Sequence, residues 1–174
     1  MSQLLRWQVG TVRITRIQEL AAPGMRFVVP QATLDNLAGI PWLAPFLAAN
    51  SDAMGSVHAL VLEVAEQRII VDTCVGNDKE RRIPSWNKRQ GPFLTQLTEA
   101  GYPPESIDTV ICTHLHTDHV GWNTRLVEER VTSVQNLAVY LCGNSGMLKD
   151  VTETVRKKGL CPIYREKFYD DPPT

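Results

Sequence analysis

The sequence predicts an α+β protein, and three observations carry that prediction. Residues 6–72 contain two pairs of strand-like segments, residues 91–101 follow the pattern of a short helix, and residues 108–112 form an apolar, β-branched run that ends at a cluster of histidines. Short apolar or alternating runs bounded by turn residues are typical of strands, whereas apolar positions three or four residues apart are typical of helices. A sheet with a helix packed on it is therefore expected.

The first segment, residues 6–17, alternates apolar and polar side chains around a turn at Gly10. This alternation predicts an opening hairpin with one face buried and one face in water. The next stretch, residues 19–50, contains four prolines, and a proline inside a helix removes a hydrogen bond and clashes with the preceding turn. Only short helical pieces are expected there, at residues 33–37 and 42–49.

Residues 56–64 and 68–72 predict a second hairpin, because two apolar runs are separated by a short turn. Such continuous runs suit strands that are covered on both faces. Asp72 ends the second run, just before the turn glycine Gly76. A carboxylate there is costly to bury unless it accepts hydrogen bonds, so Asp72 is expected to orient a neighbouring group. His58 stands alone in the first run and is expected to be a hydrogen-bonded core residue.

Residues 91–101 predict a helix that packs on the sheet. Pro92 suits the first turn of this helix, and Gly101 suits its end. Phe93 and Leu97 are four residues apart and therefore share one face. The connection after Gly101 leads into the next predicted strand.

That strand, residues 108–112, delivers the chain into a segment where three of the four histidines and one aspartate fall within six positions. Imidazoles need partners for both ring nitrogens, so this density indicates zinc or another borderline divalent ion. If the chain stays extended, the i, i+2 spacing of His114 and His116 puts both rings on one side. Asp118 and His119 belong to the next turn. They would point to a second metal, or Asp118 would hold a metal-bound water and act as its base.

The pattern His-x-His-x-Asp-His at the end of a strand, followed by Val120-Gly121, resembles the metallo-β-lactamase superfamily of metal-dependent hydrolases. The resemblance covers about residues 6–125. It implies an αββα sandwich, of which residues 1–126 would be one half, a truncated metallo-β-lactamase-like domain. It also implies a hydrolase reaction, the attack of a metal-bound hydroxide on an ester, lactone or related substrate. The segment Gly121-Trp122-Asn123 is closest to the lactonase and organophosphate-hydrolase branches.

The same resemblance implies the site residues. His114 and His116 would bind a first metal, Asp118 and His119 would bind a second, and Asp72 would lie behind these ligands and steady the histidine loop. Asp118 would take part in catalysis, as a ligand or as a general base. One or two zinc ions, or another divalent metal, are the expected cofactor.

The family would also supply a third histidine for the first metal and a bridging aspartate from its second half. The residues after 126 contain no histidine. Cys142, Cys161, a carboxylate or a partner chain in a homodimer would have to replace the missing ligands. The alternative is a metal-binding but catalytically inactive, truncated or fused fragment.

Residues 127–174 predict a separate β-α-β tail, with strands at 136–143 and 162–169 around a helix that Ser145 caps and Gly159 ends. This tail resembles the C-terminal end of ferredoxin reductase-type flavoprotein oxidoreductases. The residues that carry the likeness are Tyr140, Cys142, Gly143 and Met147. The chain has no Gly-x-Gly-x-x-Gly motif, so a structural tail is favoured over the third alternative, a remnant of a nicotinamide-dependent flavoprotein reductase.

Composition limits the classes of binding partner that the chain is expected to have. The formal net charge is −1 and no block of basic residues occurs, so there is no electrostatic case for nucleic-acid binding. The N-terminus lacks a signal-peptide pattern and no apolar run is long enough to span a membrane. The four cysteines are scattered without a Cys-x-x-Cys pair, as expected for reduced thiols. A cytoplasmic protein with a small-molecule substrate is the expectation.

Overall fold

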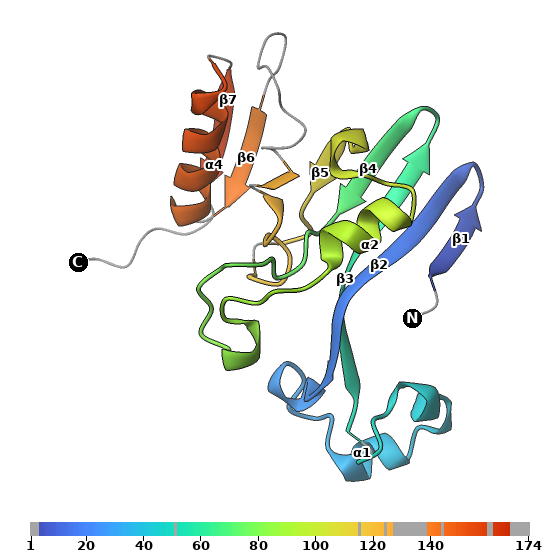
Figure 1. Ribbon diagram of the computed structural model, residues 1–174. Coiled ribbons are helices and arrows are strands. Elements are labelled where there is room, and N and C mark those ends of the chain that lie inside the picture. The colour runs from blue at the N-terminus through green and yellow to red at the C-terminus, as the bar shows by residue number, and fades with distance from the viewer. Residues whose placement is uncertain are drawn as a thin grey trace.

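The computed structural model describes residues 4–50, 52–114, 116–123, 125–126, 139–143, 145–159 and 162–167. It shows an α+β arrangement in which a long twisted sheet carries most of the chain and a smaller β-α-β unit follows it (Figure 1). This confirms the predicted class.

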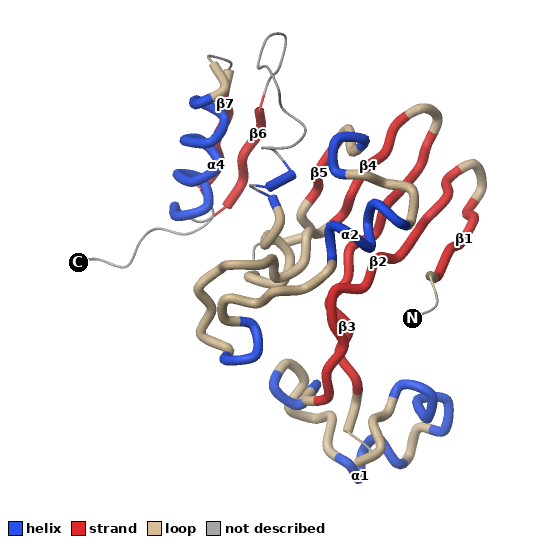
Figure 2. The backbone as a smooth tube through the Cα atoms, in the orientation of Figure 1, coloured by secondary structure: helices blue, strands red, loops and turns tan. Residues whose placement is uncertain are grey.

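The larger sheet has five strands in the order β1-β2-β3-β4-β5, which Figure 2 shows in red. Its strands are β1 (Leu5–Val9), β2 (Val12–Pro23), β3 (Met54–Val64), β4 (Gln67–Val71) and β5 (Thr109–Ile111). The pairs β1–β2, β2–β3 and β3–β4 are antiparallel, so both predicted hairpins are confirmed. Gly10, in the first turn, has a φ of +59°, a conformation that glycine adopts without steric cost.

Strand β5 pairs with β4 in parallel, with Val71 opposite Ile111. Parallel neighbours need a crossover connection, and here the connection contains α2 (Phe93–Glu99). The parallel pairing also brings the carboxyl ends of β4 and β5 to the same edge of the sheet. Both loops that carry predicted site residues begin at this edge.

Helix α2 covers one face of the sheet. Phe93 and Leu97 of this helix are fully buried, and they pack in one cluster with Ile17, Val61 and Ile70 from three neighbouring strands. This is the apolar core, and it confirms the face expected from the four-residue spacing in the helix. Burial of these side chains is the main stabilising term for the sheet and helix together.

The other face of the sheet is less covered than predicted. Ile14, Leu62 and Val71 lie on it and are only half-buried, and Ile111 is 46% exposed. The prediction of a buried strand over residues 108–112 is therefore wrong in part: the strand is three residues long and alternates. The reason is that the described residues place a helical layer on one face only.

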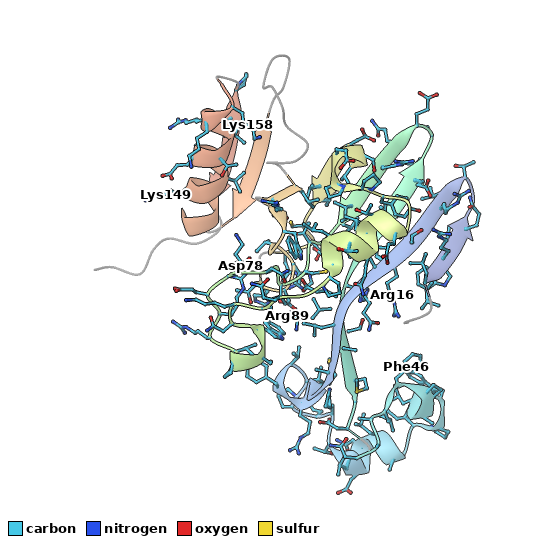
Figure 3. The ribbon with its side chains drawn as sticks, in the orientation of Figure 1. Arg16, Phe46, Asp78, Arg89, Lys149 and Lys158 are labelled. Carbon is cyan, nitrogen blue, oxygen red and sulfur yellow. The ribbon has the colours of Figure 1, made fainter. Side chains whose placement is uncertain are left out.

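Between β2 and β3 the chain makes an excursion of short helical turns, as the prolines predicted. These are η1 (Met25–Phe27), α1 (Leu34–Ala38) and η2 (Pro41–Phe46). Thr33 caps α1 by accepting a hydrogen bond from the Asn36 amide. The segment lies beyond the end of the sheet and leaves Phe46 58% exposed (Figure 3).

The tail has the predicted β-α-β order. Its elements are β6 (Val139–Gly143), α4 (Ser145–Lys157) and β7 (Ile163–Lys167), with β6 and β7 paired in parallel. Leu148, Val151 and Val155 form the buried face of α4. The ends of the predicted strands, at 136–138 and 168–169, lie outside the described residues. The proposed boundary between residues 1–126 and 127–174 stays a prediction. None of the described helices is long and apolar enough to cross a membrane.

We predict that Leu97→Ala lowers the free energy of unfolding by about 2–5 kcal/mol, because it leaves a cavity beneath the sheet. Leu34→Ala is the matched control, since Leu34 is 49% exposed and its truncation should change the free energy of unfolding by less than about 0.5 kcal/mol. Urea unfolding followed by circular dichroism measures both. Equal effects of the two substitutions would contradict the assignment of the core.

Candidate metal centre

The predicted ligands lie on the loop that follows β5, and Asp72 lies on the loop that follows β4. The two loops are joined by backbone hydrogen bonds. The Asp72 amide donates to the Ile111 carbonyl at 2.8 Å, and the Thr73 amide donates to the His119 carbonyl at 2.8 Å. These bonds join residues that are 39 and 46 positions apart in the sequence, so the two loops lie side by side.

Asp72 contacts both ends of the histidine loop. Its carboxylate accepts hydrogen bonds from the Thr113 amide and hydroxyl, each at 2.8 Å, and Oδ2 lies 2.9 Å from Nδ1 of His119. Burial raises the pKa of this carboxyl, but the hydrogen bonds from Thr113 and the contact with His119 outweigh burial and hold the pKa below its ordinary value. Asp72 is therefore a carboxylate at neutral pH.

The contacts of Asp72 also fix which ring nitrogen of His114 and of His119 lies on its side. Thr113 donates its one hydroxyl hydrogen to Asp72, so it can only accept from Nδ1 of His114, which lies 3.1 Å away. Nδ1 of His119 faces the Asp72 carboxylate directly. In both histidines Nδ1 is thus the nitrogen held on the Asp72 side, and Nε2 is the nitrogen turned away from it.

The two Nε2 atoms face other predicted ligands. Nε2 of His114 lies 3.1 Å from Nδ1 of His116, and the two rings meet edge to face. Nε2 of His119 lies 3.4 Å from Oδ2 of Asp118. His114 and His119 also contact each other, with ring centroids 3.8 Å apart. The structure thus brings all four predicted ligands into one cluster.

The backbone reaches this arrangement by another route than predicted. His114 and His116 lie in bends, and residues 117–119 form a turn, so the chain is not extended through the cluster. The expectation of an extended i, i+2 segment is wrong, although the two imidazoles still lie on one side. The reason is that the chain turns back at once to pair with the loop after β4.

Two nitrogen ligands on one tetrahedral zinc ion lie roughly 3.3 Å apart. The separations within the His114–His116 pair and the His119–Asp118 pair, 3.1 and 3.4 Å, are close to this value. Imidazole and carboxylate donors also suit zinc chemically. Among the described residues, however, no group of three or more histidine, cysteine or acidic side chains is arranged to hold an ion. The described residues thus bring the predicted ligands together as two pairs.

A comparison of the sequence with known families gives a match to the metallo-beta-lactamase superfamily over residues 53–136. Residues 53–136 are therefore similar to a metallo-beta-lactamase superfamily domain. The matched region contains β3, β4, α2, β5 and the whole histidine cluster. No curated protein matches the chain.

Solved structures with this fold are similar to most of the chain. They include the hydrolase AbOPH of the beta lactamase superfamily, at 17% identity and a TM-score of 0.54, covering 99% of this chain and 63% of that one. AidC, a dizinc quorum-quenching lactonase, matches at 14% identity and a TM-score of 0.55, over 97% of this chain and 63% of that one. A probable metal-dependent hydrolase from Staphylococcus aureus matches at 13% identity and a TM-score of 0.50, over 96% of this chain and 63% of that one.

At these identities the likeness shows the fold alone. The chain spans 63% of the length of each of the three structures. The mixed five-stranded sheet matches part of the metallo-β-lactamase fold, as the sequence predicted. The matched regions extend into the tail, and nothing in these comparisons supports its likeness to ferredoxin reductase-type oxidoreductases.

Two glycines allow the loop after β4 and the loop after β5 to touch. A Cβ atom on Gly121 would lie 2.0 Å from the carbonyl carbon of Val75, and one on Gly76 would lie 2.5 Å from the Gly121 carbonyl oxygen. Gly76 also has a φ of +78°. The amide of Gly121 donates to the Cys74 carbonyl at 2.7 Å across this contact. The glycine that follows the histidine pattern is thus required for backbone packing.

The thiols near the cluster are not in the form that binds metal. Burial is the main cause that raises the pKa of Cys74 and of Cys112, so both stay protonated at neutral pH. The side chain of Cys142 and the whole of Cys161 lie outside the described residues, so their predicted role as substitute ligands stays a prediction. His58, the fourth histidine, has Nδ1 3.0 Å from the Ser56 hydroxyl, so the expected hydrogen bond is present. It is only half-buried, so the expectation of a core position is wrong.

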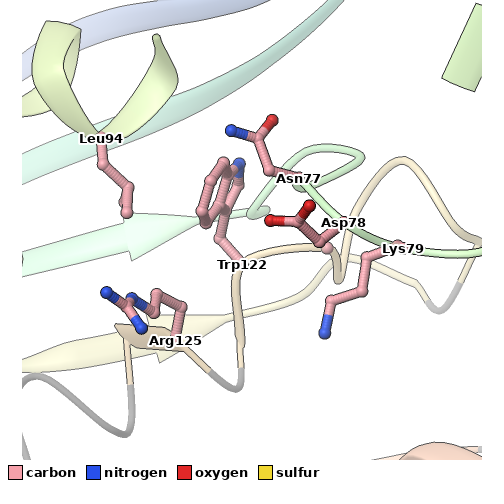
Figure 4. Close-up of a pocket in the computed structure, with 7 residues that line it drawn as sticks. Asn77, Asp78, Lys79, Leu94, Trp122 and Arg125 are labelled. Carbon is pink, nitrogen blue, oxygen red and sulfur yellow. The ribbon is translucent and has the colours of Figure 1, made fainter. Parts of the chain in front are cut away.

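A cavity of about 400 Å³ lies between the same two loops and α2 (Figure 4). Its size suits a small molecule. It is lined by Asn77, Asp78, Lys79, Leu94, Gly121, Trp122 and Arg125.

Sequence reasoning missed Glu19. This residue lies in β2, is only 8% exposed, and accepts hydrogen bonds from both loops. The sequence pattern that could have revealed Glu19 is the alternation of inward and outward side chains in β2. Thr15, Ile17 and Glu19 all face inward. An acidic residue at an inward position should have been expected to hold a partner. The strand predicted from the sequence ended at residue 17, two residues before Glu19.

We predict that Gly121→Ala separates the two loops and lowers the free energy of unfolding by about 1–3 kcal/mol or more, because the added methyl group overlaps backbone atoms. Gly39→Ala is the matched control: its nearest neighbour would be 3.6 Å from the new Cβ, and its φ of −74° suits alanine. Urea unfolding of the metal-free protein measures both. Equal stability of the two variants would show that the loops do not touch as described.

Proposed function

We propose that this chain is a metal-dependent hydrolase of the metallo-β-lactamase fold that acts on an ester, lactone or related small molecule. The single observation that supports this most is the pairing of His114 with His116 and of Asp118 with His119, at separations that suit two ligands of one ion. The similarity in fold to hydrolases, one of them a dizinc lactonase, supports the reaction class and leaves the substrate open.

In this proposal His114 and His116 hold one zinc ion, and Asp118 and His119 hold a second. Zinc bound at these residues would lower the pKa of a water molecule and polarise the bond to be cleaved. Asp72 holds the Nδ1 side of both rings, through Thr113 for His114 and by direct contact for His119. Nε2 of each ring is thus oriented toward the position of an ion before any ion arrives.

Asp118 has two possible roles, and its surroundings suit both. As a ligand it would share an ion with His119. As a general base it would accept a proton from the attacking water, because its Oδ2 lies at the cluster, 3.4 Å from Nε2 of His119. The further ligands that each ion needs would come from residues outside the described ranges, or from a second copy of the chain in a homodimer.

One observation favours a second candidate, a metal-binding protein without activity. The described residues supply two pairs and no group of three ligands. Such pairs could bind an ion weakly and leave it without the geometry for turnover. The two candidates differ in what metal removal does to activity.

We predict that His116→Ala lowers zinc affinity at least about tenfold, because loss of a ligand should cost no less than loss of a residue that supports one. His58→Ala is the control, since His58 lies outside the cluster and bonds to Ser56. Elemental analysis after dialysis against buffered zinc measures the stoichiometry of each variant. Unchanged zinc content in His116→Ala would refute the ligand assignment.

We also predict that turnover of aryl esters and γ-lactones is lost on treatment with a chelator and returns when zinc is added back. Spectrophotometric assays of the purified chain before and after chelation provide the measurement. Bound zinc without turnover would favour the inactive metal-binding protein. Turnover that survives complete removal of metal would exclude the proposed reaction.

A further inference from the structure

Glu19 is a buried carboxylate at the junction of the two site loops, and the proposed reaction does not use it. Oε2 accepts a hydrogen bond from the Val75 amide at 2.8 Å. Oε1 accepts from the Gly76 amide at 3.2 Å and from the indole Nε1 of Trp122 at 2.9 Å. Its donors are 56, 57 and 103 residues away in the sequence, so only the folded chain assembles this group.

The three donors belong to two different loops. Val75 and Gly76 lie on the loop that begins at Asp72. Trp122 lies on the loop that carries His119, three residues after it. One carboxylate from β2 therefore links the loop that orients the ligands to the loop that bears them.

Both sides of this link are anchored. The Trp122 ring stacks on Phe93 of α2 at a centroid distance of 5.8 Å, which joins its loop to the core. The Val75 carbonyl accepts a hydrogen bond from Nη2 of Arg81 at 2.9 Å, while its amide is held by Glu19. The peptide groups around Val75 thus have little freedom to shift.

The chemistry of the three contacts specifies a carboxylate. All three partners are N–H donors, and an ionised carboxylate is the side chain that accepts at both oxygens and donates at neither. A glutamine of the same shape would turn an NH2 group toward at least one of these donors. An apolar side chain would leave all three donors without a partner in the interior, where each costs stability.

We propose that Glu19 is a positioning residue that sets the spacing between the Asp72 loop and the His119 loop, and through it the geometry of the ligand cluster. It touches no ligand itself. The backbones of the two loops are in direct contact at Gly76 and Gly121, so the loops cannot move closer together. A shift at Val75 must therefore move Asp72 relative to His119. The effect on metal binding rests on the proposed function, whereas the effect on the loops does not.

The test compares Glu19→Gln with Thr15→Val in the full chain. Thr15 is the matched control: it lies on the same face of β2, is fully buried, and bonds to the Tyr102 hydroxyl at 2.8 Å, away from both loops. Zinc affinity is measured by competition with a chromophoric chelator. The visible spectrum of the cobalt(II) form reports ligand geometry, and hydrogen exchange of the Val75, Gly76 and Gly121 amides in the metal-free protein reports the loops.

We expect Glu19→Gln to lower zinc affinity by about 10- to 100-fold, the effect of losing a group that orients ligands. Its cobalt spectrum should change, and the three amides should exchange faster. Thr15→Val should destabilise the sheet but leave zinc affinity, the cobalt spectrum and these amides as in the unmodified chain. Trp122→Phe, which removes one of the three donors and keeps an aromatic ring, should lower zinc affinity by a smaller factor.

Unchanged affinity and unchanged amide exchange in Glu19→Gln would overturn the proposal, as would an equal loss of affinity in Thr15→Val. If Glu19→Gln does not fold, Trp122→Phe decides by the same readouts. If the unmodified chain binds no zinc, the proposed function fails, and amide exchange alone judges Glu19: faster exchange at Val75 and Gly76 supports its role, and unchanged exchange refutes it.

Discussion

The parallel pairing of β4 with β5 is the constraint on which the candidate site depends. It places the ends of two strands side by side, so the loops that leave them start in contact. Hydrogen bonds from the amides of Asp72 and Thr73 then extend this pairing beyond the sheet. The ligand cluster is in effect a continuation of the sheet, which explains how an exposed turn can hold four polar side chains in one arrangement.

Two carboxylates, those of Asp72 and Glu19, hold the loops after β4 and β5 in place. Asp72 accepts from Thr113 and faces His119, and Glu19 accepts from Val75, Gly76 and Trp122. A buried carboxylate is costly unless donors surround it, and in both places the donors are backbone or ring N–H groups, or a hydroxyl, of the loops themselves. The cost of burying each carboxylate is thus offset by the same contacts that fix the loops.

Much of the fold, and the gathering of histidines and aspartate after β5, could be predicted from the sequence because their signals are local. The hairpins around Gly10 and residue 65, the helix at Phe93 and the histidine pattern all depend on neighbours a few residues apart. Glu19 and the exposure of Ile111 could not be read in this way. The partners of Glu19 are up to 103 residues away, and the burial of Ile111 depends on which layer covers its face. The contacts that Nδ1 of His114 and of His119 make with Thr113 and Asp72 are likewise created only by folding.

The distribution of burial within the cluster bears on the kind of metal site it can be. His114 and His116 are exposed, whereas Asp118 and His119 are half-buried against the loop after β4. A structural zinc site surrounds its ion with four protein ligands and excludes solvent, and the described residues do not supply such a set. A catalytic site instead needs positions that water and substrate can occupy. The exposure of His114 and His116 leaves such positions open toward solvent, while Asp72 fixes the cluster from behind. In the proposed function each ion still needs a further protein ligand beyond its pair, because a catalytic zinc site has three.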